Sequence, residues 1–232
     1  KISIPYILSW ILVYGVVSTF SLQYFSAFFV TSLTCAVLGA VYCYTQTVNR
    51  FFYIMLFVVV GSLINFLDLL TFPVITLCVP MVILLTREIN KEKSVGENFI
   101  TVIICSMAWG VSYGVTWLTK WIIASVSLGK NVVADALEQI VFRTGGSQAY
   151  PIDRVQVLKS NLSCIKILEF FVTTPWVWII IVLIILLLGN WNHILKALPL
   201  LLVALIPYVW YEVLCSHSAI HVFFTYKSQM GT

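Results

Sequence analysis

Two histidines near the end of the chain, His217 and His221, are four residues apart in the stretch CSHSAIH. On a helix this spacing places both imidazoles on one face, where they could donate protons to one ligand or bind one metal ion. Asp68 is the only charged residue between positions 51 and 86, so it could be a general base or could position a cation near a phosphate. The structural alternatives are ordinary interfacial hydrogen bonds for the histidines, and a helix N-cap or a partner for Lys120 in the case of Asp68.

Metal binding is an open alternative for these three side chains. Asp68, His217 and His221 together would complete a three-ligand site for a divalent cation, Mg²⁺ or Mn²⁺. No glutamate is present in an HExxH arrangement, so metalloprotease chemistry is not supported. We therefore name the three residues as candidate catalytic groups and assign no metal ligand.

Three basic residues, Lys120, Arg143 and Arg154, fall in a polar stretch from 120 to 166. Charge-assisted hydrogen bonds from such side chains could hold the phosphate or pyrophosphate of a lipid. The alternative is a solvated face that contacts lipid headgroups. We name these three residues as candidate phosphate-binding groups.

The composition is typical of a membrane protein. Apolar residues make up 61% of the 232 residues and charged residues 9%, whereas soluble domains carry about 25% charge. One buried core could not hide so much apolar surface, so we expect the bilayer to be the solvent. No basic stripe with interleaved aromatic residues occurs, which excludes nucleic acid as a partner. Membrane lipid and other membrane proteins are the expected partners.

The apolar stretch 51–86 organises the topology. It is too long for one crossing, which needs roughly 20 residues, so we expect two helices joined by a tight turn at Asp68, with Pro73 in the first turn of the second. Arg50 precedes this hairpin and Arg87 follows it. Because basic residues favour the cytoplasmic side, Asp68 should face outward.

The whole chain is predicted to be all-α, a polytopic transmembrane helical bundle with about seven crossings. The expected crossings are 4–20, 24–44, two within 51–86, 99–119, 170–188 and 198–214. This arrangement puts every basic short connector on one side of the plasma membrane. We divide the chain into transmembrane helices at 1–119, an extracytoplasmic subdomain of interfacial amphipathic helices at 120–169, and transmembrane helices with an outer segment at 170–232.

Two local patterns add detail. From Val132 the apolar residues recur at helical spacing opposite a polar face, which suits a helix lying in the membrane interface, and a second such helix is expected at 155–167. Gly110 and Gly114 have the spacing that allows close helix approach. Because the chain begins with Lys1 rather than Met, we expect it to be part of a longer protein.

A family resemblance rests on FLDLLTFPVITLCVPMVILL, WGVSYGVTWLTKWIIASV and PYVWYEVLCSHSAIHVFFTYK. Together these stretches resemble the C-terminal half of uncharacterised multi-spanning membrane proteins of Gram-positive bacteria. Their layout is similar to that of GT-C glycosyltransferases, which use polyprenyl-phosphate sugars. The likeness covers most of the chain. The first outer turn, 21–23, lacks the acidic residue that such enzymes carry there, so either that loop lies upstream or the chain is not an active transferase.

The resemblance implies sugar transfer from a lipid-linked sugar on the extracytoplasmic face. His217, His221, Lys120 and Arg143 would then contact the phosphate, and Asp68 would occupy a supporting acid or cation position. Two other functions stay open, a transporter or flippase for a lipid-linked saccharide and a non-catalytic membrane scaffold. Clustering of the candidate groups on one face favours an enzyme or a binding site.

Overall fold

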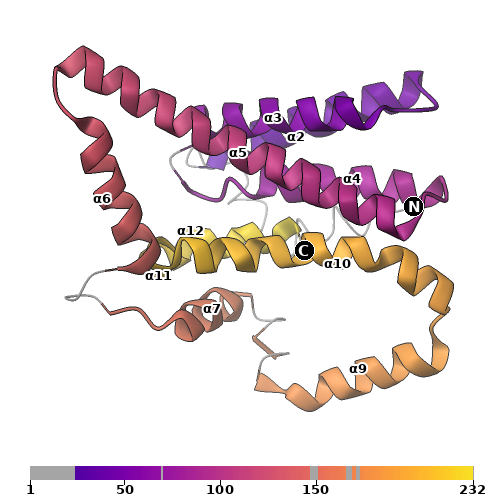
Figure 1. Cartoon of the computed structure of the whole chain (residues 1–232). Helices are drawn as coiled ribbons and strands as arrows, with labels where there is room; N and C mark the ends of the chain where they lie inside the picture. The colour runs from indigo at the N-terminus through magenta and orange to yellow at the C-terminus, as the bar shows by residue number, and fades with distance from the viewer. Residues whose placement is uncertain (1–23, 69, 147–150, 166–168, 171–172, 232) are drawn as a thin grey trace.

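In a computed structural model that describes residues 24–231, except 69, 147–150, 166–168 and 171–172, every regular element is a helix (Figure 1). The expectation of an all-α chain is confirmed for this part of the protein. The helices are α2 (Phe25–Tyr44), α3 (Arg50–Leu67), α4 (Ile75–Asn90), α5 (Val95–Leu128), α6 (Val132–Gly145), α7 (Arg154–Ser163), α9 (Pro175–Leu188), α10 (Trp191–Val213), α11 (Cys215–Ile220), α12 (Val222–Thr225) and the 3₁₀ helix η2 (Tyr226–Gly231).

Four of these helices are long and apolar enough to cross a membrane: α2, α3, α5 and the Ile194–Val213 part of α10. The first expected crossing, 4–20, lies outside the described residues. α4 has 16 residues and α9 has 14, so at 1.5 Å per residue α9 is about 21 Å long, less than a bilayer core of about 30 Å. The expectation of a membrane-type helical chain therefore holds in its coarse form, with four candidate spans among the described helices.

The bundle consists of α2, α3, α4, α5 and α10, which lie side by side (Figure 1). The most extensive contact is between α3 and α5, and Gly61 makes it possible. A Cβ atom at position 61 would overlap the Trp109 carbonyl oxygen and the Ser112 hydroxyl of α5. Glycine at this position is therefore what lets the two helices approach so closely.

Gly110 and Gly114, whose spacing allows close helix approach, do not lie where the described helices meet. Among the residues that the structure describes, a Cβ atom at either position would have no neighbour within 4 Å, and both glycines are exposed. These residues lie on the outward face of α5, whereas Trp109 and Tyr113, one position earlier in each case, are buried. A spacing pattern does not say which face of a helix it occupies, and this one faces away from the bundle.

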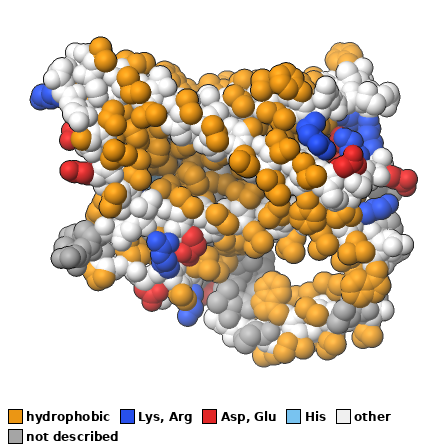
Figure 2. Space-filling view, in the orientation of Figure 1, with side chains coloured by type: hydrophobic (Ala, Val, Ile, Leu, Met, Phe, Trp, Pro, Cys, Tyr) orange, Lys and Arg blue, Asp and Glu red, His pale blue; other side chains and the backbone are white. Residues whose placement is uncertain are grey.

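Charged side chains gather toward the ends of the bundle, and apolar side chains cover the middle of the visible face (Figure 2). At one end Arg87 of α4 holds the end of α2. Its Nη2 donates to the carbonyl oxygen of Thr45 at 2.7 Å, and its guanidinium lies 3.9 Å from the centre of the Tyr42 ring. The neighbouring Glu88 accepts a hydrogen bond from the Tyr53 hydroxyl and pairs with Lys93. The connection from α3 to α4, which contains Asp68, lies at the opposite end (Figure 1).

Several helix ends differ from the expected ones. α5 continues to Leu128, nine residues past the expected end at Thr119, so Lys120 is a residue of this long helix and the division at 119/120 falls inside it. A capping box between Ser94 and Glu97 fixes its start. α10 remains one helix through Pro199 and Pro207.

The end of the chain folds back on the bundle. η2 packs against α4 and α10. Asn161 of α7, which is fully buried, joins these pieces. Its Oδ1 accepts from the Thr225 hydroxyl at 2.8 Å, and its carbonyl oxygen accepts from the Gln229 amide at 2.8 Å. Asn161-Leu-Ser has the form of an N-glycosylation sequon, but the Asn161 side chain is buried and not accessible for glycosylation.

Candidate functional site

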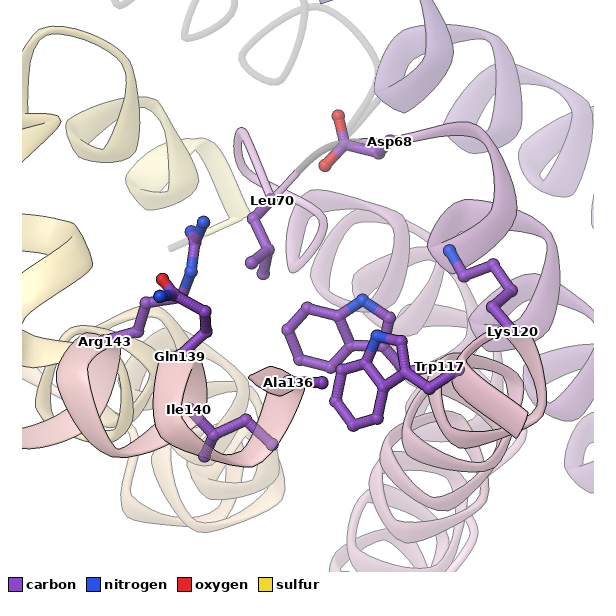
Figure 3. A pocket seen from close by; sticks show the side chains of 9 residues that line it. Asp68, Leu70, Trp117, Lys120, Ala136, Gln139, Ile140 and Arg143 are labelled. Carbon is purple, nitrogen blue, oxygen red and sulfur yellow. The ribbon is translucent and has the colours of Figure 1, made fainter. Parts of the chain in front are cut away.

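A cavity of about 440 Å³ lies between α5, α6 and the connection from α3 to α4 (Figure 3). Three of the six predicted site residues line it: Asp68, Lys120 and Arg143. The other lining residues are Leu70, Trp117, Trp121, Ala136, Gln139 and Ile140. Residues far apart in sequence thus form one wall that combines two cations, a carboxyl group and two indoles.

Asp68 follows the last residue of α3 and is buried, with 6% of its surface exposed. Its carboxylate accepts hydrogen bonds from both the backbone N–H, at 2.9 Å, and the hydroxyl of Thr71. These bonds close a local turn. The alternative role as N-cap of the following helix is wrong, because Val74 occupies that position. Burial raises the pKa of Asp68 above its ordinary value, against the opposing effect of the Thr71 hydrogen bonds.

Lys120 reaches the cavity from α5. Its Nζ donates to the backbone oxygen of Asn65 at 2.7 Å, so the expected pairing with Asp68 is replaced by a bond to the last turn of α3. A cation at this place satisfies a terminal carbonyl and interacts favourably with the helix dipole. Its remaining N–H donors are available to a second acceptor.

Arg143 near the end of α6 is held by His217 of α11. The Nη1 of Arg143 lies 3.1 Å from Nδ1 of His217, and the Nε2 of His217 lies 2.8 Å from the carbonyl oxygen of Leu70. A guanidinium only donates and a carbonyl only accepts, so Nδ1 accepts and Nε2–H donates. Both contacts require the neutral imidazole with its proton on Nε2. Burial is the main reason why the pKa of His217 is lowered to about 4, which agrees with this assignment.

Leu70 has a backbone φ of +66°, a left-handed conformation that a leucine rarely adopts. Such strain costs of order 1–3 kcal/mol and persists only where surrounding contacts hold it. The hydrogen bond from His217 to its carbonyl and the burial of its side chain are two such contacts. The strained residue is part of the cavity wall.

His221 does not line the cavity. Its ring centre is 4.7 Å from that of His217, and it stacks on Phe224 at 5.0 Å. The two histidines are thus neighbours, as their spacing indicates. No group of three His, Cys, Asp or Glu side chains in the described part of the chain is arranged to hold a metal ion. Because both ring nitrogens of His217 already have partners, the Asp68–His217–His221 metal site is not formed.

Arg154 lies away from the cavity. Its Nη1 contacts the backbone oxygen of Glu212 at 2.7 Å and the carboxylate of Glu212 at 3.3 Å. Glu212 lies in an apolar run, and Arg154 is its ion-pair partner. This ion pair joins α7 to α10, so Arg154 does not belong to the same group as Lys120 and Arg143.

The aromatic residues of the site follow a pattern that was visible in the sequence but was not used. Trp109, Tyr113, Trp117 and Trp121 are each four residues apart on α5, so they lie on one face of the helix. Neighbouring rings are 5.1, 5.7 and 5.3 Å apart in that order. This row runs along α5 to the cavity, where its last two members are half-buried.

The arrangement suits an anionic group that is attached to an apolar one. Lys120 and Arg143 offer charge-assisted hydrogen bonds to an anion, and the indoles offer apolar surface. Asp68 provides a carboxyl group whose raised pKa suits proton transfer. Comparison with protein-family models, curated proteins and solved structures finds no match to this chain.

Proposed function

We propose that this chain belongs to a multi-pass protein of the plasma membrane that binds the phosphate of a lipid-linked sugar in the cavity beside Asp68. The observation that carries the proposal is the convergence of Lys120 and Arg143 with Trp117 and Trp121 in one cavity. An anion attached to an apolar tail can contact the basic side chains and the indoles of the cavity at the same time. A soluble anion would make no use of the exposed tryptophan surface, and an uncharged lipid would leave the cations without an acceptor.

The cavity is proposed to face the extracytoplasmic side. The end of the bundle opposite Asp68 carries the connections from α2 to α3 and from α4 to α5 (Figure 1). Three basic residues lie in or beside these connections: Arg50, Arg87 and Lys93. Basic residues in short connectors favour the cytoplasmic side. α6, which is amphipathic and has no buried residue, would then lie in the outer membrane interface.

The reaction proposed is sugar transfer of the GT-C type. The hydroxyl oxygen of an acceptor attacks the anomeric carbon, and the bond between that carbon and the phosphate oxygen breaks. Its electron pair stays with the lipid phosphate, where Lys120 and Arg143 stabilise the charge. The acceptor proton moves to the carboxylate of Asp68. A divalent cation is not required for this balance.

Translocation of a lipid-linked saccharide is the second candidate. The row of aromatic rings from Trp109 to Trp121 extends from the cavity along about 18 Å of α5. Its two half-buried members, Trp117 and Trp121, would offer apolar surface to a passing lipid without any covalent step. A non-catalytic scaffold, by contrast, would need neither the cavity nor its charges.

The experiment is done on the full-length protein in its native membrane. Asp68→Asn and Arg143→Gln are introduced singly, insertion is confirmed, and extracted lipid-linked sugars and surface glycan are measured. We expect loss of glycan with accumulation of a polyprenyl-phosphate sugar. Accumulation on the outer leaflet supports transfer, and accumulation on the inner leaflet supports translocation. Unchanged glycan and lipid pools in both variants would refute the site and favour the scaffold.

A further inference from the structure

His217 was a candidate for direct contact with the phosphate, but its surroundings leave it no free ring nitrogen. Nδ1 faces the Arg143 guanidinium at 3.1 Å, and Nε2 faces the Leu70 carbonyl oxygen at 2.8 Å. The residue is 3% exposed and is absent from the cavity wall, whereas both of its partners line that wall. Any effect of His217 on a ligand must therefore pass through Arg143 or Leu70.

The two partners come from different parts of the chain. Arg143 is on α6, Leu70 is in the connection from α3 to α4, and His217 is on α11, which packs against α6. The imidazole bridges the two sides of the cavity at a fixed width. Without it the guanidinium would lose the acceptor that orients it, and the left-handed Leu70 would lose a contact that stabilises it.

We propose that His217 is a positioning residue, which orients the Arg143 guanidinium and fixes the Leu70 carbonyl so that a phosphate meets a preformed donor. This inference rests on the proposed function, because it assumes that Arg143 receives the anion. Of the five N–H groups on a guanidinium, one of the two on Nη1 points to His217. The others remain for the ligand, already oriented before the ligand arrives.

Two conservative variants separate the two hydrogen bonds. The amide of His217→Asn reaches about as far as Nδ1, toward Arg143, and the longer His217→Gln reaches about as far as Nε2, toward Leu70. If orientation of Arg143 is what matters, the asparagine retains binding and the glutamine loses it. The leucine variant His217→Leu removes both bonds.

The test measures binding of polyprenyl phosphate to the full chain in phosphatidylcholine nanodiscs, with His217→Leu, Arg143→Gln and the double variant. We expect His217→Leu to weaken binding by about tenfold, the effect of one charge-assisted hydrogen bond. In the Arg143→Gln background we expect His217→Leu to have no further effect.

Three outcomes would overturn the inference. They are an equal effect of His217→Leu in both backgrounds, no effect of His217→Leu on binding, and better binding by His217→Gln than by His217→Asn. If Arg143→Gln binds polyprenyl phosphate as well as wild type does, the proposed function fails as well. Failure of the proposed function is therefore distinguished from failure of the role of His217 alone. If His217→Leu does not fold, the relative affinities of His217→Asn and His217→Gln for polyprenyl phosphate still test the inference.

Discussion

The Nζ atom of Lys120 lies 2.7 Å from the backbone oxygen of Asn65, so a cation of α5 closes the end of α3 at the edge of the cavity. The contact has two consequences. It holds together the two helices that make the most extensive contact in the bundle, and it fixes a positive charge on the wall of the cavity that Asp68 and Arg143 also line. The contact between the two helices and the proposed ligand site therefore share one side chain.

Removal of this charge should weaken anion binding. Lys120→Met keeps the length of the side chain but loses the ammonium, and we expect affinity for polyprenyl phosphate in nanodiscs to fall by about tenfold. Lys130→Met is the matched control, since Lys130 is exposed just past the end of the same helix and does not line the cavity. Equal losses in the two variants would indicate general electrostatic attraction rather than a site.

Asp68→Asn should abolish most of the transfer activity. The amide keeps an oxygen that can accept from Thr71 but cannot take a proton from the acceptor, and loss of a general base costs about 10² to 10⁴ in rate. Sugar transfer in proteoliposomes measures this, and binding of the donor lipid checks that the cavity persists. Glu138→Gln on exposed α6 is the control. Full activity in Asp68→Asn would remove Asp68 from the chemistry.

Gly61→Ala should destabilise the bundle. The added methyl group would overlap the Trp109 carbonyl and the Ser112 hydroxyl, and forcing α3 away from α5 costs about 1–3 kcal/mol. Gly114→Ala makes the same chemical change on the open face of α5 and should be neutral or slightly stabilising, as alanine is the better helix former. Thermal unfolding in detergent compares the two. Equal melting temperatures would contradict the close contact.

Stability should fall on acidification through His217. Its pKa is 6.5 when unfolded and about 4 when buried beside Arg143 and His221, so between these values the unfolded chain binds more protons. His217 makes its full contribution to the free energy of unfolding above pH 6.5. About 3 kcal/mol of that free energy is lost as the pH falls to 4. The lowered pKa of His221 acts in the same direction, and the raised pKa of Asp68 acts in the opposite one. The difference between wild type and His217→Asn isolates His217, and equal pH profiles would contradict its neutral state.

The helical architecture was accessible from the sequence because it depends on local patterns. The apolar runs around 24–44 and 51–67 correspond to α2 and α3 to within a residue or two, and the periodicity from Val132 corresponds to α6. The end of α5 was missed because Lys120 looked like the start of a polar segment. Its ammonium bonds to Asn65, a tertiary contact that lets a charge continue an apolar helix.

The site was predictable in part, for a similar reason. Asp68, Lys120 and Arg143 were named from charge alone, and the fold brings them to one cavity. The same reasoning also named Arg154, which pairs with Glu212, because charge does not say which partner a side chain finds. The role of Leu70 depends on a left-handed backbone and on a histidine 147 residues away, neither of which leaves a local signal.

The most direct test compares two lipids that differ only in their phosphate. Binding of polyprenyl phosphate and of polyprenol is measured by native mass spectrometry on the full chain, on Arg143→Gln and on Arg154→Gln. We predict that wild type and Arg154→Gln prefer the phosphate lipid by at least about tenfold and that Arg143→Gln loses the preference. Equal binding of both lipids by wild type, or an unchanged preference in Arg143→Gln, would contradict a phosphate site in this cavity.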